Sequence, residues 1–138
     1  MSQVNTIDKV EVKKRYYDSG ALWYEIPYKK GRKHGIVKWY YASGALEWET
    51  PFVNGKEHGI VKWYHESGVL LAETPCVNGK AHGITRLYYE SGALKRETPY
   101  VNDKEHGIEK TYDKDTSNIA RLELYDKGRE VLTLCCGI

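Results

Sequence analysis

The sequence repeats every 24 residues, and this period constrains the fold more than any other feature of the chain. Three markers keep the spacing without an insertion or a deletion. They are Ser-Gly at Ser19, Ser43, Ser67 and Ser91, the only four prolines at Pro27, Pro51, Pro75 and Pro99, and His-Gly-Ile starting at His34, His58, His82 and His106. Such a spacing indicates a repeat architecture, in which each unit packs against its neighbours.

Each unit contains two strand-like runs and two turn signals. Residues 36–41 are rich in β-branched and aromatic types and end at Ser43-Gly44, and residues 45–53 end at Asn54-Gly55. Asn-Gly between extended runs is a strong hairpin signal, because both residues tolerate positive φ. No segment has the 3.6-residue apolar period of a helix. The sequence therefore predicts an all-β fold: an elongated antiparallel meander of β-hairpins with about eleven strands, arranged as a solenoid-like single sheet.

The chain has the length of one domain, and we expect residues 1–138 to form a single repeat domain. Within it we expect an N-terminal half repeat at 8–17, four full units over 16–111 and a degenerate cap at 112–138. The start of the chain has no apolar leader, and three cysteines without a spacing pattern favour a reducing compartment. These features favour the cytoplasm and leave open a secreted protein whose leader was removed. The net charge of +2 gives no broad field for nucleic acid.

Comparison of the four copies separates constant from varying positions. The alternating positions of Ile36, Lys38 and Tyr40 recur in every unit with one Lys-to-Arg exchange. We expect these rows to form the buried face, together with Leu22, Leu46, Leu70 and Leu94 and with Tyr28, Phe52, Cys76 and Tyr100. A three-residue loop at Ser43-Gly44 pairs Tyr40 with Leu46. The Asn54-Gly55 turn gives compatible faces only with a longer loop that includes Lys56 or with a bulge near His58-Gly59.

The other parity changes along the chain, and its aromatic residues concentrate in the N-terminal half. On the second strand of each unit, the varying position holds Trp23, Glu47, Leu71 and Lys95. We expect Trp23, Trp39, Tyr41 and Trp63 to form a contiguous aromatic patch, and exposed aromatic patches commonly mark binding sites. Two interpretations stay open. The patch binds a partner, or a second layer, a dimer contact or self-packing covers it.

The repeated histidines and glutamates do not predict an active site or a metal site. Equivalent positions lie two strands apart, ~9.6 Å, so His34, His58, His82 and His106 cannot converge on one ion, and we expect them to stabilise turns. We expect Glu25, Glu49, Glu73 and Glu97 to pair with lysine or histidine along the sheet, because catalytic carboxylates need two different environments. No nucleophile set is identifiable, so we expect no enzyme activity, no cofactor and no metal.

The combination of Tyr-x-Ser-Gly-x-Leu with Asn-Gly-Lys-x-His-Gly-Ile resembles the MORN repeat, in particular its bacterial variant, which also occurs in proteins labelled YwqK-type antitoxins. The resemblance covers Tyr16 to about Tyr112 well. It implies an elongated antiparallel sheet that associates with protein or lipid. Asp103 departs from the pattern, since Gly31, Gly55 and Gly79 occupy this place in the other copies, and this predicts a strained or differently shaped turn.

Three hypotheses for the function follow. The first is a non-catalytic module that binds another, unidentified protein, in an antitoxin-like manner. The second is a scaffold associated with anionic lipid through the row Lys38, Lys62, Arg86 and Lys110, which the near-zero charge disfavours. The third is self-assembly, with a homodimer formed through a sheet edge (residues 10–17 or 129–134) or through the aromatic face. Nucleic acid is not an expected partner.

Overall fold

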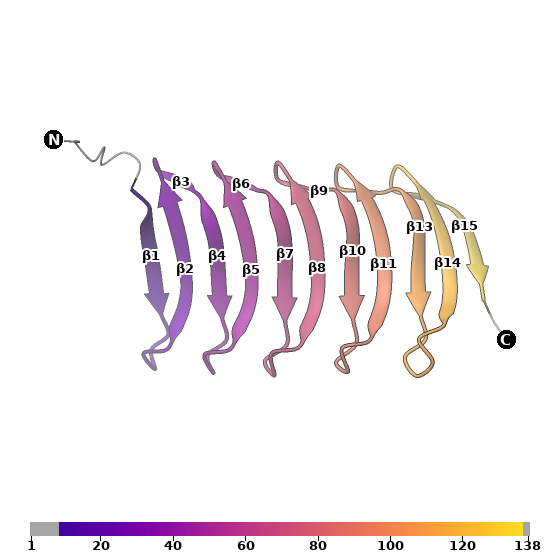
Figure 1. Ribbon diagram of the computed structural model, residues 1–138, viewed down its shortest axis with the longest axis horizontal. Helices are drawn as coiled ribbons and strands as arrows, with labels where there is room; N and C mark the ends of the chain where they lie inside the picture. The colour runs from indigo at the N-terminus through magenta and orange to yellow at the C-terminus, as the bar shows by residue number, and fades with distance from the viewer. Residues whose placement is uncertain (1–8, 137–138) are drawn as a thin grey trace.

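The computed structural model describes residues 9–136 as one antiparallel sheet, which confirms the predicted all-β fold. Residues 1–8 and 137–138, which include the first residue of the expected half repeat, lie outside the described residues. The strands follow one another across the sheet in chain order (Figure 1), so that every hairpin contacts the next one along the chain. The main ladder holds eleven strands, as the sequence predicts.

The eleven strands of the main ladder are β1 (Glu11–Tyr16), β2 (Leu22–Lys29), β4 (Gly35–Tyr40), β5 (Leu46–Val53), β7 (Gly59–Tyr64), β8 (Leu70–Val77), β10 (Gly83–Tyr88), β11 (Leu94–Val101), β13 (Gly107–Tyr112), β14 (Ile119–Asp126) and β15 (Arg129–Cys135). Four two-residue strands each pair with the end of the preceding long strand. They are β3 (Arg32–Lys33), β6 (Lys56–Glu57), β9 (Lys80–Ala81) and β12 (Lys104–Glu105). Together with their turns they form the upper rim in Figure 1.

The Asn-Gly turns have the geometry that their residue types favour. Val53 pairs with Lys56 across a two-residue turn in which Asn54 and Gly55 have φ of 49° and 84°. Left-handed conformations at both central positions match the twist of the flanking strands. In the fourth copy, Asp103 has φ of 68° and its carboxylate accepts the backbone N–H of Ala81 at 2.7 Å. The turn keeps the pairing of the other copies, so the prediction of a different shape is wrong. The hydrogen bond to Ala81 stabilises a non-glycine residue in the left-handed conformation.

A bulge at His-Gly restores the register after each of these turns. Gly59 has φ of +123°, and beyond it Glu49 pairs with Lys62, so of the two predicted solutions the structure uses the bulge. The backbone N–H of His58 donates to the carbonyl of Pro51 at 3.0 Å. A proline ring lies directly over the glycine of the bulge. A Cβ built on Gly59 would lie 2.7 Å from Pro51 Cγ, which explains why this position is glycine. The Ser-Gly loop pairs Tyr40 with Leu46, as predicted.

The two faces of the sheet are the reverse of the predicted ones. Ile36 and its three equivalents are 41–52% exposed, whereas Val37 and Val61 on the opposite face are 3% and 4% exposed. Phe52 pairs with Gly35 and therefore lies on the same face as Val37, not with Ile36. Cys76 occupies the Phe52 position and is buried, as expected of a small apolar side chain. The isoleucine row is thus exposed, the lysine and tyrosine rows beside it are partly exposed, and most of the buried positions lie on the varying face.

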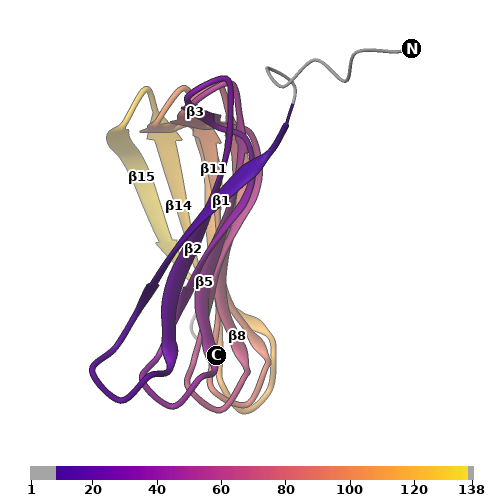
Figure 2. The same cartoon turned by 90° about the vertical axis from the view of Figure 1, so that its left-hand side faces the viewer.

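Burial in a single layer comes from the curvature of the sheet. Figure 2 shows one twisted layer whose short-strand rim bends to one side. The rim bends toward the face that carries Val37. The evidence is Lys33 of β3, whose Nζ lies over the Phe52 ring, 5.0 Å from its centroid. We name this side the tryptophan face (Val37, Trp39, Trp48, Thr50 and their equivalents). The opposite side is the ladder face (Ile36, Lys38, Tyr40, Glu49, Pro51 and their equivalents).

Candidate functional site

The ladder face carries a row of alternating charges that runs across the sheet. Its members pair as cross-strand neighbours in the order Lys14, Glu25, Lys38, Glu49, Lys62, Glu73, Arg86, Glu97 and Lys110. Arg86 Nε donates to Glu97 Oε2 at 3.1 Å, and its Nη1 lies 3.7 Å from Glu73 Oε1. The predicted Glu–Lys ladder is thus confirmed. Each cation of the row Lys38, Lys62, Arg86 and Lys110 has at least one glutamate as a cross-strand neighbour.

Each glutamate of this row also accepts a hydrogen bond from a tyrosine of the next long strand. Tyr40, Tyr64, Tyr88 and Tyr112 donate their hydroxyls to Glu25, Glu49, Glu73 and Glu97 at 3.0, 3.0, 3.0 and 2.6 Å. Burial and the hydrogen bond to the glutamate raise the pKa of Tyr40 to about 12, and the same causes act on Tyr64. These constant residues stabilise the scaffold through contacts with one another.

The tryptophan face carries a continuous aromatic cluster over the N-terminal hairpins. The Trp23 and Trp39 rings lie 5.7 Å apart, and Trp39 continues to Trp48 at 5.3 Å in an edge-on arrangement. Trp48 then pairs across the ladder with Trp63. The structure therefore brings the predicted residues Trp23, Trp39 and Trp63 together on one face. Trp23 is the most accessible of them, with 41% of its surface exposed, whereas the other rings are half-buried.

Tyr41, the fourth predicted site residue, takes part in a contact between repeats. Its hydroxyl donates to the backbone carbonyl of Tyr64 at 2.8 Å. Tyr17 and Tyr89 make the same contact with the carbonyls of Tyr40 and Tyr112. Tyr41 thus holds neighbouring hairpins together through its hydroxyl, and its ring is half-buried.

Sequence comparison missed three members of the cluster. The Tyr17 ring lies 5.7 Å from that of Trp23, and Tyr24 and Trp48 are the direct cross-strand partners of Trp39. The ring of Tyr24 lies 4.5 Å from that of Trp39. The varying face was expected to hold the neighbouring positions instead, those of Trp23 and Glu47. The pairing of Tyr40 with Leu46 predicts Glu47 opposite Trp39, but the register shift between Trp39 and Tyr40 places Trp48 there.

The C-terminal half of the tryptophan face carries buried charge at positions that hold valine and threonine near the N-terminal end. Glu109 and Glu123 pair across β13 and β14 and are 4% and 8% exposed. Glu109 accepts a hydrogen bond from Thr98 at 2.7 Å, and Arg121 lies 2.7 Å from Glu123. Burial, followed by the hydrogen bond with Glu109, raises the pKa of Glu123. The carboxyls occupy the positions that Val37 and Thr50 have in the second unit.

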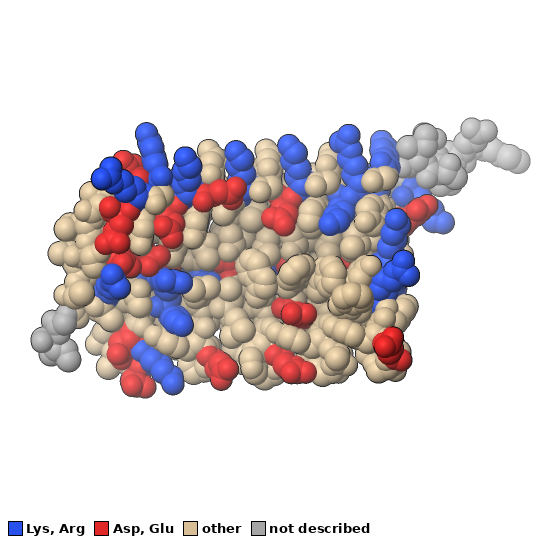
Figure 3. Space-filling model, turned by 180° about the vertical axis from the view of Figure 1, so that it is seen from behind, with Lys and Arg blue, Asp and Glu red and all other residues tan. Residues whose placement is uncertain are grey.

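The hairpin rim combines basic and apolar side chains. Lys56, Lys80 and Lys104 are exposed, and their cross-strand partners Val53, Val77 and Val101 are 44%, 42% and 42% exposed. Seen from behind (Figure 3), basic side chains line the upper rim and the middle of the view is mostly uncharged. Acidic side chains gather at the C-terminal end of the same view, on the left.

The histidines next to the bulges contact the turns of the following units. His34 Nδ1 accepts the backbone N–H of Asn54 at 3.4 Å, and His106 Nδ1 accepts that of Lys127 at 3.3 Å. This supports the predicted turn-stabilising role. Within residues 9–136, no three His, Cys, Asp or Glu side chains group so that they could hold a metal ion. The same part of the chain has no helix with the length and apolar character needed to cross a membrane.

Comparison with known families gives one match. The sequence model of the family described as MORN repeat variant matches four consecutive segments, at residues 12–30, 33–54, 57–78 and 81–102, which together cover more than half of the chain. Each segment begins within or just before one hairpin of the sheet and ends at or next to an Asn-Gly-type turn. A search of the curated proteins finds no match.

Proposed function

From the premise that this chain belongs to the MORN repeat variant family, we infer that it is a non-catalytic module that binds another protein through the aromatic cluster of the tryptophan face. MORN repeats are generally modules for interaction with proteins or membranes. The observation that carries the proposal is the cluster of Trp23, Trp39, Trp48 and Trp63 on a sheet that has no second layer over the described residues.

The cluster has the chemistry of a protein contact. Tryptophan and tyrosine dominate the energetics of protein interfaces, because their rings offer a large apolar area at a low cost in conformational entropy. The four tryptophans of the chain all lie in this cluster, and the equivalent positions farther along hold Ala72, Leu87 and Arg96. The partner therefore meets an apolar surface over the N-terminal hairpins only. Neutralisation of a toxin, as in the antitoxin-labelled proteins that the sequence resembles, is the form of binding that we propose.

Paired substitutions on the two faces of the same strands test this function. Trp39→Ala with Trp63→Ala removes two cluster rings from β4 and β7, and Ile36→Ala with Ile60→Ala removes exposed side chains from the opposite face. Capture from an extract of the producing cells should recover the same partner with the wild type and with the isoleucine variant, and lose it with the tryptophan variant. Trp23→Ala, at the most exposed ring, tests the surface with less effect on packing. Retention of the partner by all the tryptophan variants would refute the assignment.

The rim favours association with anionic lipid as a second candidate function. It presents lysine beside exposed valine at three successive turns, so cations and apolar side chains reach the same surface. Basic residues near an anionic membrane surface contribute about 1 kcal/mol each. Sedimentation with phosphatidylserine vesicles at low salt tests it, with Lys56→Glu, Lys80→Glu and Lys104→Glu combined in one variant. This candidate requires pelleting of the wild type and loss of pelleting in the variant; the absence of either result excludes it.

A further inference from the structure

The last hairpin departs from the repeat on the ladder face. In the inner units this face has one row of Ile and Pro and one row of alternating charge. In the last hairpin, Leu124 and Leu132 continue the first row, whereas Leu122 and Leu134 continue the row of charges, next to Lys110. The charge ladder therefore ends in leucine where the inner strands have glutamate and lysine.

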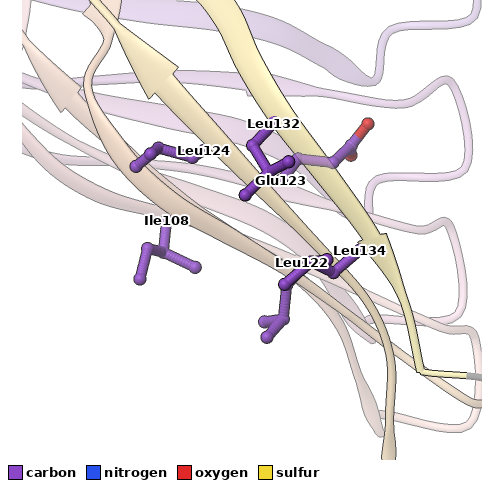
Figure 4. A pocket seen from close by; sticks show the side chains of 6 residues that line it. All are labelled: Ile108, Leu122, Glu123, Leu124, Leu132 and Leu134. Carbon is purple, nitrogen blue, oxygen red and sulfur yellow. The ribbon is translucent and has the colours of Figure 1, made fainter.

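These leucines form one exposed apolar surface, which we name the leucine cluster (Ile108, Leu122, Leu124, Leu132 and Leu134). It lines a hollow of about 140 Å³. Figure 4 shows Ile108, Leu122 and Leu124 on one side of the sheet and the Glu123 carboxylate pointing to the other side. Leu132 and Leu134 are 51% and 53% exposed. Terminal units of repeat arrays ordinarily have a more polar outer surface than inner ones, and here the end is less polar, which indicates that something covers it.

The outer edge of β15 adjoins the leucine cluster. Among residues 9–136, β15 pairs only with β14, so the backbone groups on its other side have no strand partner. Natural edge strands are usually protected by lysine, proline or inward-pointing charge. The stretch from Val131 to Leu134 contains none of these. An exposed apolar edge of this kind is suited to pairing with another strand.

The direction of the strands decides which strand of a second copy can pair there. The ladder holds eleven alternating strands, so β1 and β15 run in the same direction. When the ladder faces of the two copies lie on the same side, pairing of β15 with β1 of another copy is therefore parallel. Pairing of β15 with its own equivalent across a two-fold axis is antiparallel, like the rest of the sheet, and closes as a dimer.

We propose that two copies of this chain associate through their β15 strands, antiparallel and two-fold symmetric, so that the two leucine clusters merge into one. The register centres on Thr133, which pairs with Thr133 of the partner subunit. Leu132 then lies opposite Leu134 of the partner subunit on the ladder face. In this register each leucine faces a leucine of the partner subunit. The central pair at Thr133 also lies away from Glu130, where the register between β14 and β15 shifts.

The opposite edge does not offer the same contact. β1 carries Lys13, Lys14 and Arg15 in succession. Two-fold pairing of β1 with its equivalent would place six cations along one short ladder, and like charges at facing positions destabilise a strand pair. Pairing through β15 leaves the aromatic clusters at the two far ends of one continuous sheet, on the same side, so that the dimer presents two binding surfaces.

Sedimentation equilibrium of the full chain over its soluble concentration range tests the association. Edge-to-edge contacts fall among small interfaces, below ~1,200 Å², so we expect a dimer that dissociates on dilution. Leu132→Glu with Leu134→Glu should give a monomer at all concentrations. Val10→Glu with Val12→Glu, which introduces the same charges at exposed valines beside the other edge, should leave the dimer intact. A monomeric wild type, a monomeric valine variant or a dimeric leucine variant would each overturn the proposal.

A cross-link tests the register without altering the leucines. In a chain with Cys135→Ser and Cys136→Ser, Thr133→Cys should form an intermolecular disulfide under mild oxidation, because facing Cα atoms in an antiparallel ladder lie ~4.5–5.5 Å apart, within disulfide range. Lys13→Cys in the same background is the matched control at the middle of β1 and should not cross-link. Equal cross-linking at both positions, or none at Thr133→Cys, contradicts the two-fold pairing of β15.

Discussion

Replacement of the bulge glycine Gly59 by alanine tests how the repeat keeps its register. Gly59 has φ of +123°, and an added Cβ would lie 2.7 Å from Cγ and 3.3 Å from Cβ of Pro51. A side chain held in such a conformation costs about 1–3 kcal/mol. Overpacking against a rigid group costs about 1–3 kcal/mol more. The proline is fixed between strand neighbours and cannot rotate away, so both costs apply and we expect Gly59→Ala to lose about 2–6 kcal/mol.

Gly68 provides the matched control, since it separates the two costs. It has φ of +92°, and nothing lies within 4 Å of an added Cβ. Gly68→Ala should therefore show only the backbone cost of about 1–3 kcal/mol. The free energy of unfolding in urea, measured for both variants and the wild type, compares them directly. If Gly59→Ala is no less stable than Gly68→Ala, then the proline contact does not fix the bulge and our account of the register is wrong.

Four further substitutions, one of them a control, test the assignment of the faces and the ionisable groups. Val37→Lys buries an unpaired charge at a 3% exposed position and should lower the free energy of unfolding in urea by several kcal/mol. Ile36→Lys, at a 50% exposed position, should change that free energy by less than about 1 kcal/mol. Similar losses in the two variants would contradict the assignment of the faces. Tyr64→Phe should cost about 1.5–3 kcal/mol through the lost bond to Glu49. It should also remove one late-ionising phenol from an alkaline absorbance titration, because the pKa of Tyr64 is raised to about 12; loss of a phenol that ionises near the ordinary tyrosine pKa would exclude this bond. The pKa of Glu123 is raised, so the folded chain holds a proton that the unfolded chain releases, and stability falls as pH rises from the ordinary glutamate pKa through the raised one. Glu123→Gln should therefore be more stable than the wild type at pH 7, with a smaller difference at pH 4 in thermal unfolding, and a difference that grows on acidification would refute the assignment.

Sequence alone predicted the features that depend on neighbouring residues. The Asn-Gly turns, the loop that pairs Tyr40 with Leu46 and the glycine bulge follow from the conformations that these residue types favour. The Glu–Lys ladder follows from opposite charges that recur at positions which face each other once the turns are set. These contacts are local or lie between adjacent strands, so one period of the sequence contains nearly all the information they need.

The assignment of the faces required information that the period does not contain. Both parities of the first strand carry large apolar side chains, Ile36 and Tyr40 on one and Val37 and Trp39 on the other. With no second layer over the described residues, curvature decides which parity is buried, and the bulges and the rim set that curvature. Constancy among the copies does not indicate burial here. In this sheet it reflects contacts such as Tyr40 with Glu25, which every unit must repeat for the next one to pack.

The sequence predicted only part of the candidate site, because the register of the hairpin ends could not be read from it. Trp39 and Trp63 are recognisable because they occupy one first-strand position whose residue type changes along the chain, to Leu87 and Thr111. Trp48 was missed because the register shifts beside Tyr40, at the end of the hairpin, and this moves the partner of Trp39 by one residue. The leucine cluster is also invisible to a comparison of copies, since its members lie where the repeat pattern is lost.

Hydroxyl-radical footprinting of the complex with the captured partner tests the central claim most directly, because one experiment reports on both faces. Trp23 and Trp39 lie on the tryptophan face, and Ile36 and Ile60 are about half exposed on the ladder face of the same hairpins. We predict that the partner reduces labelling of Trp23 and Trp39 and leaves Ile36 and Ile60 unchanged. Protection of the isoleucines with unchanged labelling of the tryptophans would show that the partner binds the other face.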